Sequence, residues 1–161
     1  GAIDPAIVPF IMEKKGFTPA EMDAYMNKKC GFLGISGISS DARDIEAAMK
    51  AGDEKAKLAF DMLCYQIKKF IGSYSAAMGG LDAIVFTAGI GENTPSVRAF
   101  ACEGLEYLGV GFDADANNSV ARPIGVTCLN TPDSAVKIYL IPTNEELIIA
   151  EETEQVVAAL S

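Results

Sequence analysis

The chain has 161 residues, of which 50% are hydrophobic, and a formal net charge of −9. This length and composition predict a single domain, residues 1–161, with a proper hydrophobic core, and they exclude a disordered tail. The acidic balance argues against nucleic acid or an anionic membrane as a main partner. Because the sequence contains no histidine, Ser-His-Asp and Cys-His chemistry within the chain is also excluded.

Cysteine usage and hydropathy indicate a reducing, aqueous setting. The cysteines are spread from Cys30 to Cys128 without a Cys-x-x-Cys pair, so free, buried thiols are expected rather than a metal site. No signal peptide and no apolar run approaching ~18 residues is present, which predicts a cytoplasmic protein without membrane segments. The chain lacks an initiating Met, so Gly1 is expected to be a cut within a longer chain.

Helices dominate the predicted structure of the first half. Residues 4–14 are expected to form a helix with a cap and a proline at its start, and Thr18–Glu21 reads as a capping box for a helix to about Lys29. The glycine-punctuated segment 31–38 (GFLGISGI) is expected to be a strand or a tight extended loop. Residues 54–78 have the longest helical periodicity of apolar side chains and predict a packing helix, ended by two glycines.

A polar cluster opens another helix between these segments. Asp41 or Ser40 is expected as the N-cap of a helix that runs to about Lys50. Locally, Asp41 is explained as a simple cap and Arg43 as a solvated residue of the first turn. The glycine-rich segment before them can also deliver these side chains to a ligand.

The segment 82–95 (DAIVFTAGIGENTP) changes character abruptly in its middle. Residues 84–86 are an apolar run that suits a strand buried on both faces. The Gly-Ile-Gly of residues 89–91 frees the backbone, and Asn93-Thr94 can cap a helix that Pro95 begins. The order strand, glycine turn and helix N-terminus favours an anion such as phosphate. The same spacing also fits a tight connection with no ligand, because neither Gly-x-Gly-x-x-Gly nor a P-loop lysine is present.

The following part of the chain alternates regular and irregular segments. A helix is expected from Pro95 to about Leu108, where Gly109 stops it. Residues 109–134 are expected to be irregular, and their polar cluster lacks the glycine and the bidentate glutamate of an EF-hand. A surface turn is therefore expected for Asp113, Asp115, Asn117 and Asn118. Val136–Ile141 predicts a second apolar strand.

A third strand-to-helix junction follows at residues 141–146, before an amphipathic helix through Leu160. Glu145 and Glu146 fall in the first turn of this helix, where the helix dipole explains acidic residues. A carboxylate at the end of a central strand can also hold Mg²⁺, directly or through water.

The order of these elements predicts an α/β layered domain. Polar residues repeatedly follow strands, at residues 36–44, 87–95 and 141–146. Ligands of such sheets bind in the crevice outside the carboxyl ends of the strands. The three junctions are therefore expected to converge on one cleft.

The motifs at these junctions, GISSDARD, DAIVFTAGIGEN and IPTNEEL, carry a family resemblance together with MNKKCGFLGISG and LGVGFD between them. The sequence resembles the C-terminal lobe of the acetate kinase family, the acetate/propionate/butyrate kinase group, from IDPAIVPF to the last helix. That family belongs to the acetate and sugar kinase/Hsp70/actin superfamily. The resemblance therefore implies a ribonuclease-H-like α/β lobe with a mixed sheet and flanking helices.

The resemblance also implies site residues at all three junctions. Glu145 would serve a magnesium site, which agrees with the preference of a hard cation for carboxylate oxygen. Ala42 stands where the family often has a bulky apolar residue, and Ala88 where many members have glycine. The residues implied to lie in the nucleotide pocket are Asp41, Ala42 and Arg43, and those implied to contact the adenosine part are Gly89, Ile90, Gly91, Glu92 and Asn93.

The resemblance covers only the nucleotide-binding lobe. The family's N-terminal lobe, with its acetate pocket and its catalytic arginines, aspartate and histidine, is absent, so no catalytic residue is assigned. For the intact protein it implies reversible phosphoryl transfer from ATP to acetate, with ATP/ADP and Mg²⁺ bound, and a homodimer formed through this lobe. The chain alone is expected to be inactive, because phosphoryl transfer needs charge stabilisation on all sides. A propionate or butyrate kinase lobe and a non-catalytic nucleotide-binding or dimerisation domain are the alternatives.

Overall fold

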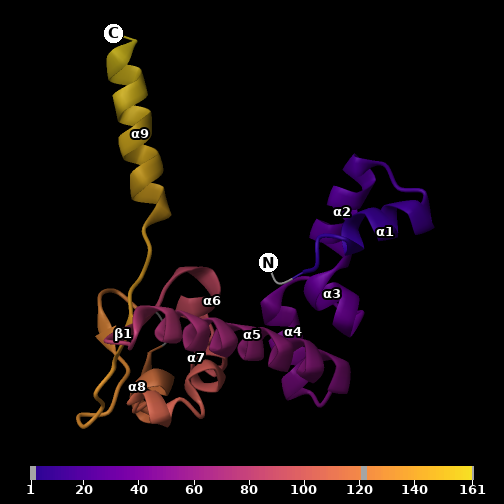
Figure 1. Ribbon diagram of the computed structural model, residues 1–161. Helices are drawn as coiled ribbons and strands as arrows, with labels where there is room; N and C mark the ends of the chain where they lie inside the picture. The colour runs from indigo at the N-terminus through magenta and orange to yellow at the C-terminus, as the bar shows by residue number, and fades with distance from the viewer. Residues whose placement is uncertain (1–2, 121–122, 161) are drawn as a thin grey trace. The chain divides into compact units, whose positions relative to one another are not determined.

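The structure is a computed structural model that describes residues 3–120 and 123–160 (Figure 1). The chain divides into two compact units, Gly1–Gln66 and Ile67–Ser161. The first, here called the helical unit, contains helices and their connections along its described residues. The second, the sheet unit, holds a small sheet together with its helices.

The helical unit is built from amphipathic helices, and the sequence predicts most of their bounds. They are α1 (Ile7–Lys15), α2 (Pro19–Lys29), α3 (Gly31–Ser36), α4 (Ala42–Lys50) and the first part of α5 (Glu54–Met78). The predicted capping box of α2 is confirmed, because Thr18 and Glu21 exchange side-chain and backbone hydrogen bonds. The buried apolar side chains of this unit are Met22, Ile45, Ala56, Ala59, Phe60 and Cys64.

The expectation of a strand or extended loop at residues 31–38 is wrong, because Gly31–Ser36 is the helix α3. Its glycines serve a tight turn between helices. A Cβ at Gly34 would lie 2.9 Å from the carbonyl oxygen of Lys29, and Gly37 closes the helix with a left-handed φ of 71°. Apolar residues between glycines therefore mark a short helix here and not a strand.

The sheet unit contains a mixed sheet of three strands in the order β1-β3-β2, as the fold prediction requires. The strands are β1 (Ala83–Phe86), β2 (Thr127–Cys128) and β3 (Lys137–Leu140); β1 is parallel and β2 antiparallel to β3. The prediction that β1 is buried on both faces is wrong, since Val85 is 51% exposed while Ile84 and Phe86 are buried. A strand at the edge of a small sheet alternates between core and solvent.

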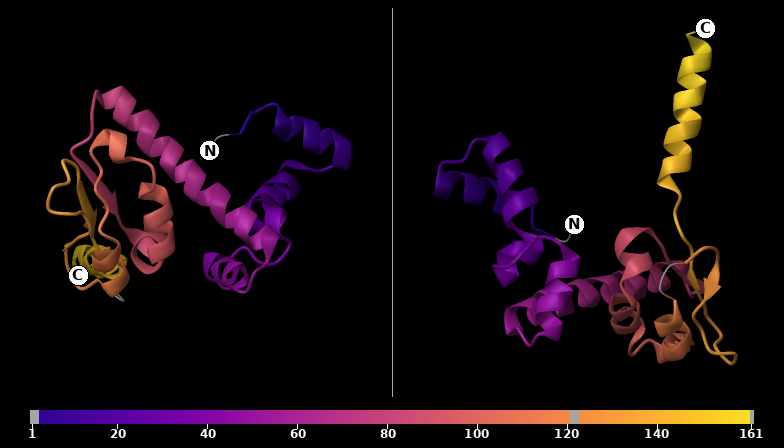
Figure 2. Two further views of the ribbon diagram at one scale, coloured as in Figure 1. Left: turned by 90° about the horizontal axis from the view of Figure 1, so that it is seen from below. Right: turned by 180° about the vertical axis from the view of Figure 1, so that it is seen from behind.

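One face of this sheet carries the core of the unit, and α7 (Pro95–Cys102) lies against it (Figures 1 and 2). Partly buried Ile67 and Ile71 of α5 pack on the same cluster. Burial of each large apolar side chain contributes roughly 1.5–3 kcal/mol, so this face dominates the stability of the unit. The buried cluster consists of Ile84, Phe86, Ala101, Cys102, Leu105, Val110, Leu129, Val136, Ile138 and Leu140.

The expected single helix from Pro95 to Leu108 is wrong in its second half. The α-helix α7 ends at Cys102, and a separate 3-10 helix, η1, covers Glu106–Leu108. Gly109 ends it in a left-handed conformation, as predicted. Residues 109–134 are also less irregular than expected, because they contain the helix α8 (Ala114–Ser119) and β2.

The last helix, α9 (Glu145–Ala159), matches its predicted bounds, but its described side chains are all exposed. No described helix combines the length and apolar character needed to cross a membrane. The cysteines are free as expected, and Cys64 and Cys102 are buried, but the expectation of burial is wrong for Cys30 and Cys128, which are exposed. Burial raises the pKa of the Cys102 thiol to about 12, which keeps it protonated and unreactive.

Candidate functional site

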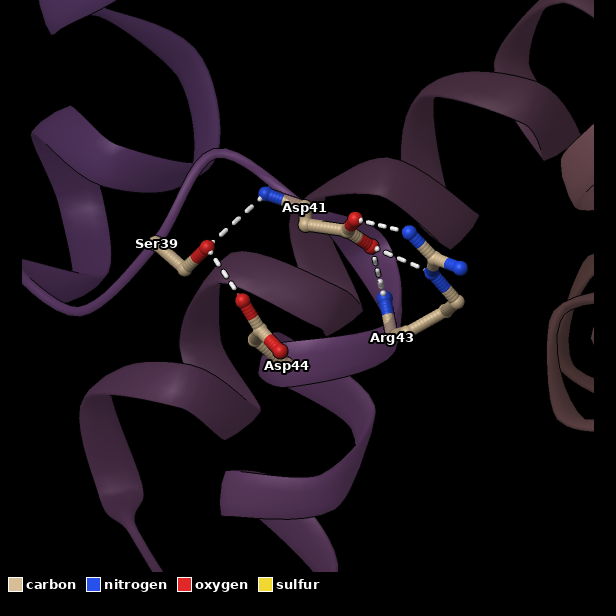
Figure 3. Close-up of polar contacts among 4 residues, drawn as sticks. All are labelled: Ser39, Asp41, Arg43 and Asp44. Carbon is tan, nitrogen blue, oxygen red and sulfur yellow. Dashed lines mark hydrogen bonds and ion pairs between the residues drawn. The ribbon is translucent and has the colours of Figure 1, made fainter.

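The start of α4 is a self-contained polar arrangement (Figure 3). Asp41 is the N-cap, as predicted, and its Oδ1 accepts the backbone N–H of Arg43 at 2.8 Å. The guanidinium of Arg43 folds back on the same carboxylate, with Nε 3.0 Å from Oδ1 and Nη2 2.6 Å from Oδ2. Ser39 donates to Asp44 and accepts the N–H of Asp41. Every partner here lies within five residues along the chain.

This arrangement leaves Arg43 pointing into solvent in an ordered position. Its side chain is 88% exposed, and two of its nitrogens are held by Asp41. The hydrogen bonds from Arg43 lower the pKa of Asp41 to about 2, and Asp41 in turn raises the pKa of Arg43. Both groups are therefore ionised at neutral pH, and the remaining Nη1 group of Arg43 is open to an anion.

The Gly-Ile-Gly segment after β1 is helical, so the predicted glycine turn is wrong. Residues Ala88–Asn93 form the short helix α6 directly after the strand. Ala88 enters it with a φ of 58°, a left-handed conformation that favours glycine. A Cβ at Gly89 would meet nothing within 4 Å, whereas one at Gly91 would lie 3.4 Å from the backbone of Phe86. Gly91 thus lies against β1 with room for a methyl group, and Gly89 leaves an open backbone surface.

The start of α7 is a poor anion site, in contrast to the expectation for a helix after the glycines. Thr94 occupies the cap position without a side-chain cap bond, and Pro95 brings no N–H. The N–H groups of Val97 and Arg98 both donate to the carbonyl oxygen of Thr94. Thr94, Val97 and Arg98 are buried, so this helix end faces protein interior.

The second and third predicted junctions do lie together. Strands β1 and β3 are parallel, with Phe86 opposite Leu140, so their carboxyl ends share one sheet edge. Beyond that pair the backbone of Ile141 donates to Phe86 at 2.9 Å. The Oε1 atom of Glu92 accepts both the N–H and the Oγ1–H of Thr143, each at 2.8 Å. These bonds lower the pKa of Glu92 and join two segments that are 51 residues apart in sequence.

Arg98 holds α6 from its other side and was missed by the sequence analysis. The side chain is fully buried, at 0% exposure. Its Nη1 donates to the carbonyl oxygens of Gly91 at 2.7 Å and Glu92 at 2.9 Å. A cation at the last carbonyls of a helix satisfies groups that have no intrahelical partner. The signal was available: Arg98 occupies a position of the apolar stripe that continues with Ala101, Cys102 and Leu105.

Asn117 completes this anchor, and its expected place in a surface turn is wrong. It lies in α8 and is 1% exposed. Its Oδ1 accepts Nε of Arg98 at 2.7 Å, and its Nδ2 donates to the carbonyl oxygen of Pro95 at 3.1 Å. The neighbouring Asp113 caps α8 by accepting the N–H of Ala116. The polar cluster is therefore a capped helix that reaches into the core with one amide.

Comparison with known proteins identifies the family to which these features belong. The profile of the acetokinase family matches residues 1–151. This chain belongs to the acetokinase family. Acetate kinase of Methanosarcina thermophila is 51% identical over 157 residues, covering 98% of this chain and 38% of that protein. The chain therefore spans well under half the length of its curated relatives.

Solved structures of the acetokinase family share the fold. The crystal structure of Porphyromonas gingivalis acetate kinase matches with a TM-score of 0.85 and 43% identity, covering 98% of this chain and 39% of that one. A propionate kinase from Francisella tularensis subsp. tularensis SCHU S4 matches with a TM-score of 0.80 and 38% identity, over 94% of this chain and 38% of that one. The α/β fold with a mixed sheet, implied by the family resemblance, is confirmed.

The described side chains of this acetokinase chain do not by themselves form a magnesium site. The described residues contain no group of three or more Asp, Glu, Cys or His side chains that could hold a metal. Glu145 is the first residue of α9, two positions after Thr143, and its side chain lies outside the described part. Mg²⁺ characteristically uses one or two carboxylates together with substrate phosphates.

Proposed function

We propose that this chain is the nucleotide-binding lobe of a kinase that transfers a phosphoryl group reversibly between ATP and acetate. The observation that carries the proposal is the similarity over nearly the whole chain to acetate and propionate kinases. Acetate and propionate are both short carboxylates. The proposal therefore names the reaction as phosphoryl transfer to a carboxylate, and acetate is its expected acceptor.

In this proposal Asp41, Ala42 and Arg43 form one side of the nucleotide pocket. Arg43 supplies an exposed guanidinium whose direction Asp41 sets, which suits an anionic ligand. The open backbone at Gly89 and the rest of the segment 89–93 receive the adenosine part.

Glu145 is proposed to hold Mg²⁺, directly or through water. The ion, when bound, neutralises charge on the phosphate oxygens. The chain itself offers no histidine and, at its three junctions, only Arg43 as an exposed cation. Acceptor binding and the remaining charge stabilisation are assigned to the part of the protein that this chain does not include.

Calorimetric titration of the 161-residue chain with ADP tests nucleotide binding. The dissociation constant is expected on the order of 0.1–1 mM, because part of the cleft is missing. Gly89→Ala is expected to weaken binding about tenfold, since its methyl group fills space that the ligand needs.

Gly72→Ala in α5 is the matched control, because a Cβ there meets only the Tyr107 hydroxyl, at 4.0 Å. Gly72→Ala raises the helix propensity by the same amount as Gly89→Ala, but it lies outside the proposed nucleotide pocket. An absence of binding at several millimolar ADP, or equal affinity in both variants, would contradict the proposed pocket.

Turnover is tested with acetate, ATP and Mg²⁺ in a hydroxamate assay on the chain and on the protein extended to the length of its relatives. The extended protein is expected to form acetyl phosphate and the chain to be inactive. Glu145→Ala in the extended protein is expected to lower activity ~10–100-fold. Equal turnover by both proteins would contradict the proposal that this chain binds the nucleotide while the rest of the protein binds the acceptor.

Self-association through this chain is a second proposed function, and one observation favours it. Helix α5 exposes large apolar side chains at helical spacing, and the rings of Phe70 and Tyr74 stack 5.9 Å apart. Sedimentation velocity is expected to detect a dimer that Tyr74→Glu disrupts, whereas Ser73→Glu, which places the same charge beside the stripe, leaves it intact. A monomer at all concentrations would contradict this function. The stripe consists of Phe70, Tyr74 and Met78.

A further inference from the structure

The carboxylate of Glu92 bonds to a segment that is distant in sequence. Its Oε1 receives two hydrogen bonds from Thr143, one from the backbone and one from the hydroxyl, both at 2.8 Å. The two bonds come from one residue and end on one oxygen, so they fix the distance between α6 and the turn that leads to α9. Charge-assisted bonds of this length are roughly twice as strong as neutral ones.

The rest of α6 is fixed to the opposite side. Nη1 of the buried Arg98 donates to the carbonyl oxygens of Gly91 and Glu92. The Nδ2 group of Asn93 donates to the carbonyl oxygen of Gly89 across the helix. Glu92 therefore has its main chain held by α7 and its side chain held by the β3–α9 turn.

The turn on the far side of this contact leads to Glu145. Thr143 lies two residues before Glu145, and Asn144 between them caps α9 by accepting the N–H of Leu147 at 3.1 Å. A shift of Thr143 would shift the helix start that carries the proposed metal-binding carboxylate. Residues that orient a metal ligand in this way typically change metal affinity 10–100-fold when they are lost.

We propose that Glu92 is a positioning residue that holds α6 and the start of α9 in one register, so that nucleotide binding and Mg²⁺ binding reinforce each other. This inference rests on the proposed nucleotide and magnesium sites. It assigns the Glu92 side chain a role through Thr143, beside the proposed contact of the segment 89–93 with the nucleotide. The coupling between nucleotide and Mg²⁺ binding depends on the hydrogen-bonded pair Glu92 and Thr143, so loss of either side chain removes part of the coupling.

The test compares ADP affinity with Mg²⁺ and with a chelator, by calorimetry on the 161-residue chain. The gain in affinity on adding Mg²⁺ is expected to fall about tenfold in Glu92→Met, which keeps the side-chain length and removes the acceptor. Thr143→Val is expected to lose part of the gain and Thr143→Ser to retain it, because serine keeps the hydroxyl. Glu103→Met, which removes the same charge from the exposed end of α7, is expected to behave as the parent.

Hydrogen exchange of the Thr143 amide gives a second readout that needs no ligand. Its protection is expected to fall in Glu92→Met and to persist partly in Glu92→Gln, whose amide oxygen still accepts. An unchanged Mg²⁺ gain in Glu92→Met, or equal losses with and without Mg²⁺, would overturn the inference while leaving the proposed function intact. A parent chain that binds no ADP would overturn both.

Discussion

Two helix starts carry the proposed nucleotide-binding residues, and the chain builds them in different ways. The start of α4 is held by contacts between residues two to five positions apart, on an exposed surface. Helix α6 is held by Arg98, six and seven positions away, and by Thr143, 51 positions away. The first arrangement can form wherever its own helix forms, whereas the second exists only when the sheet unit is folded.

This difference separates two uses of arginine. Arg43 is paired with a carboxylate in solvent, where an ion pair adds little to stability and the guanidinium stays available to a ligand. Arg98 is fully buried and bonded to neutral oxygens, so it acts as a structural anchor. Burial lowers the pKa of Arg98, yet an arginine guanidinium stays charged at neutral pH.

The largest expected effect tests this contrast directly. Arg98→Met leaves the carbonyl oxygens of Gly91 and Glu92 and the amide oxygen of Asn117 without their donor, so it should cost about 2–4 kcal/mol of unfolding free energy. Urea denaturation measures the loss. Arg43→Met is the matched control and should leave the denaturation midpoint unchanged. Similar losses in both variants would remove the distinction between anchor and ligand group.

A smaller effect is expected from two neighbouring asparagines in α8. Asn117→Ala removes the acceptor of Arg98 Nε and should lower the unfolding free energy by about 1–3 kcal/mol. Asn118→Ala changes an exposed residue and removes only a 3.3 Å bond from Asn117 Nδ2, which also bonds to Pro95, so it should stay within about 0.5 kcal/mol of the parent. Denaturation curves of the two variants settle the comparison. Equal unfolding free energies of the two variants would mean that the buried amide of Asn117 does not stabilise the position of Arg98.

Ala88→Gly sharpens the comparison by relaxing the entry to α6. The φ of 58° at this residue costs an alanine roughly 1–2 kcal/mol, and glycine recovers that strain while losing some entropy on folding. The net expected gain in unfolding free energy is about 0.5–1 kcal/mol. Ala42→Gly, at the ordinary first turn of α4, should instead destabilise the chain. A loss in both variants would show that Ala88 is not strained.

The smallest effect concerns protonation at the start of α4. The Asp41 carboxyl should titrate near pH 2, below its ordinary value of 3.8, because Arg43 stabilises its ionised form. A depressed pKa means that the contribution of the pair to stability, small on this exposed surface, is present above pH 3.8 and is lost as the pH falls through about 2. Carbon NMR of the Asp41 carboxyl measures the midpoint. In Arg43→Gln it should move back toward 3.8; an unchanged midpoint would contradict the ion pair.

Local signals in the sequence determined the helical unit with good accuracy. The capping box at Thr18 and the cap at Asp41 were read correctly, as was the long helix 54–78. These features depend on hydrogen bonds and apolar spacing within one or two helical turns. Such contacts can be predicted from residues that are neighbours in the sequence. The local reading failed at Gly31–Ser36, because a glycine that permits close helix packing looks the same in sequence as one that frees a loop.

Tertiary structure alone decided how α6 is held. The sequence placed Gly89–Asn93 after a strand and Glu145 after another, and their family resemblance named both as site residues. It gave no sign that Glu92 bonds to Thr143 or that Arg98 and Asn117 meet inside the sheet unit. Those pairs form because parallel strands bring their carboxyl ends to one edge and because α7 and α8 pack beside them. Distances of this kind depend on the whole arrangement of the elements, which no local pattern contains.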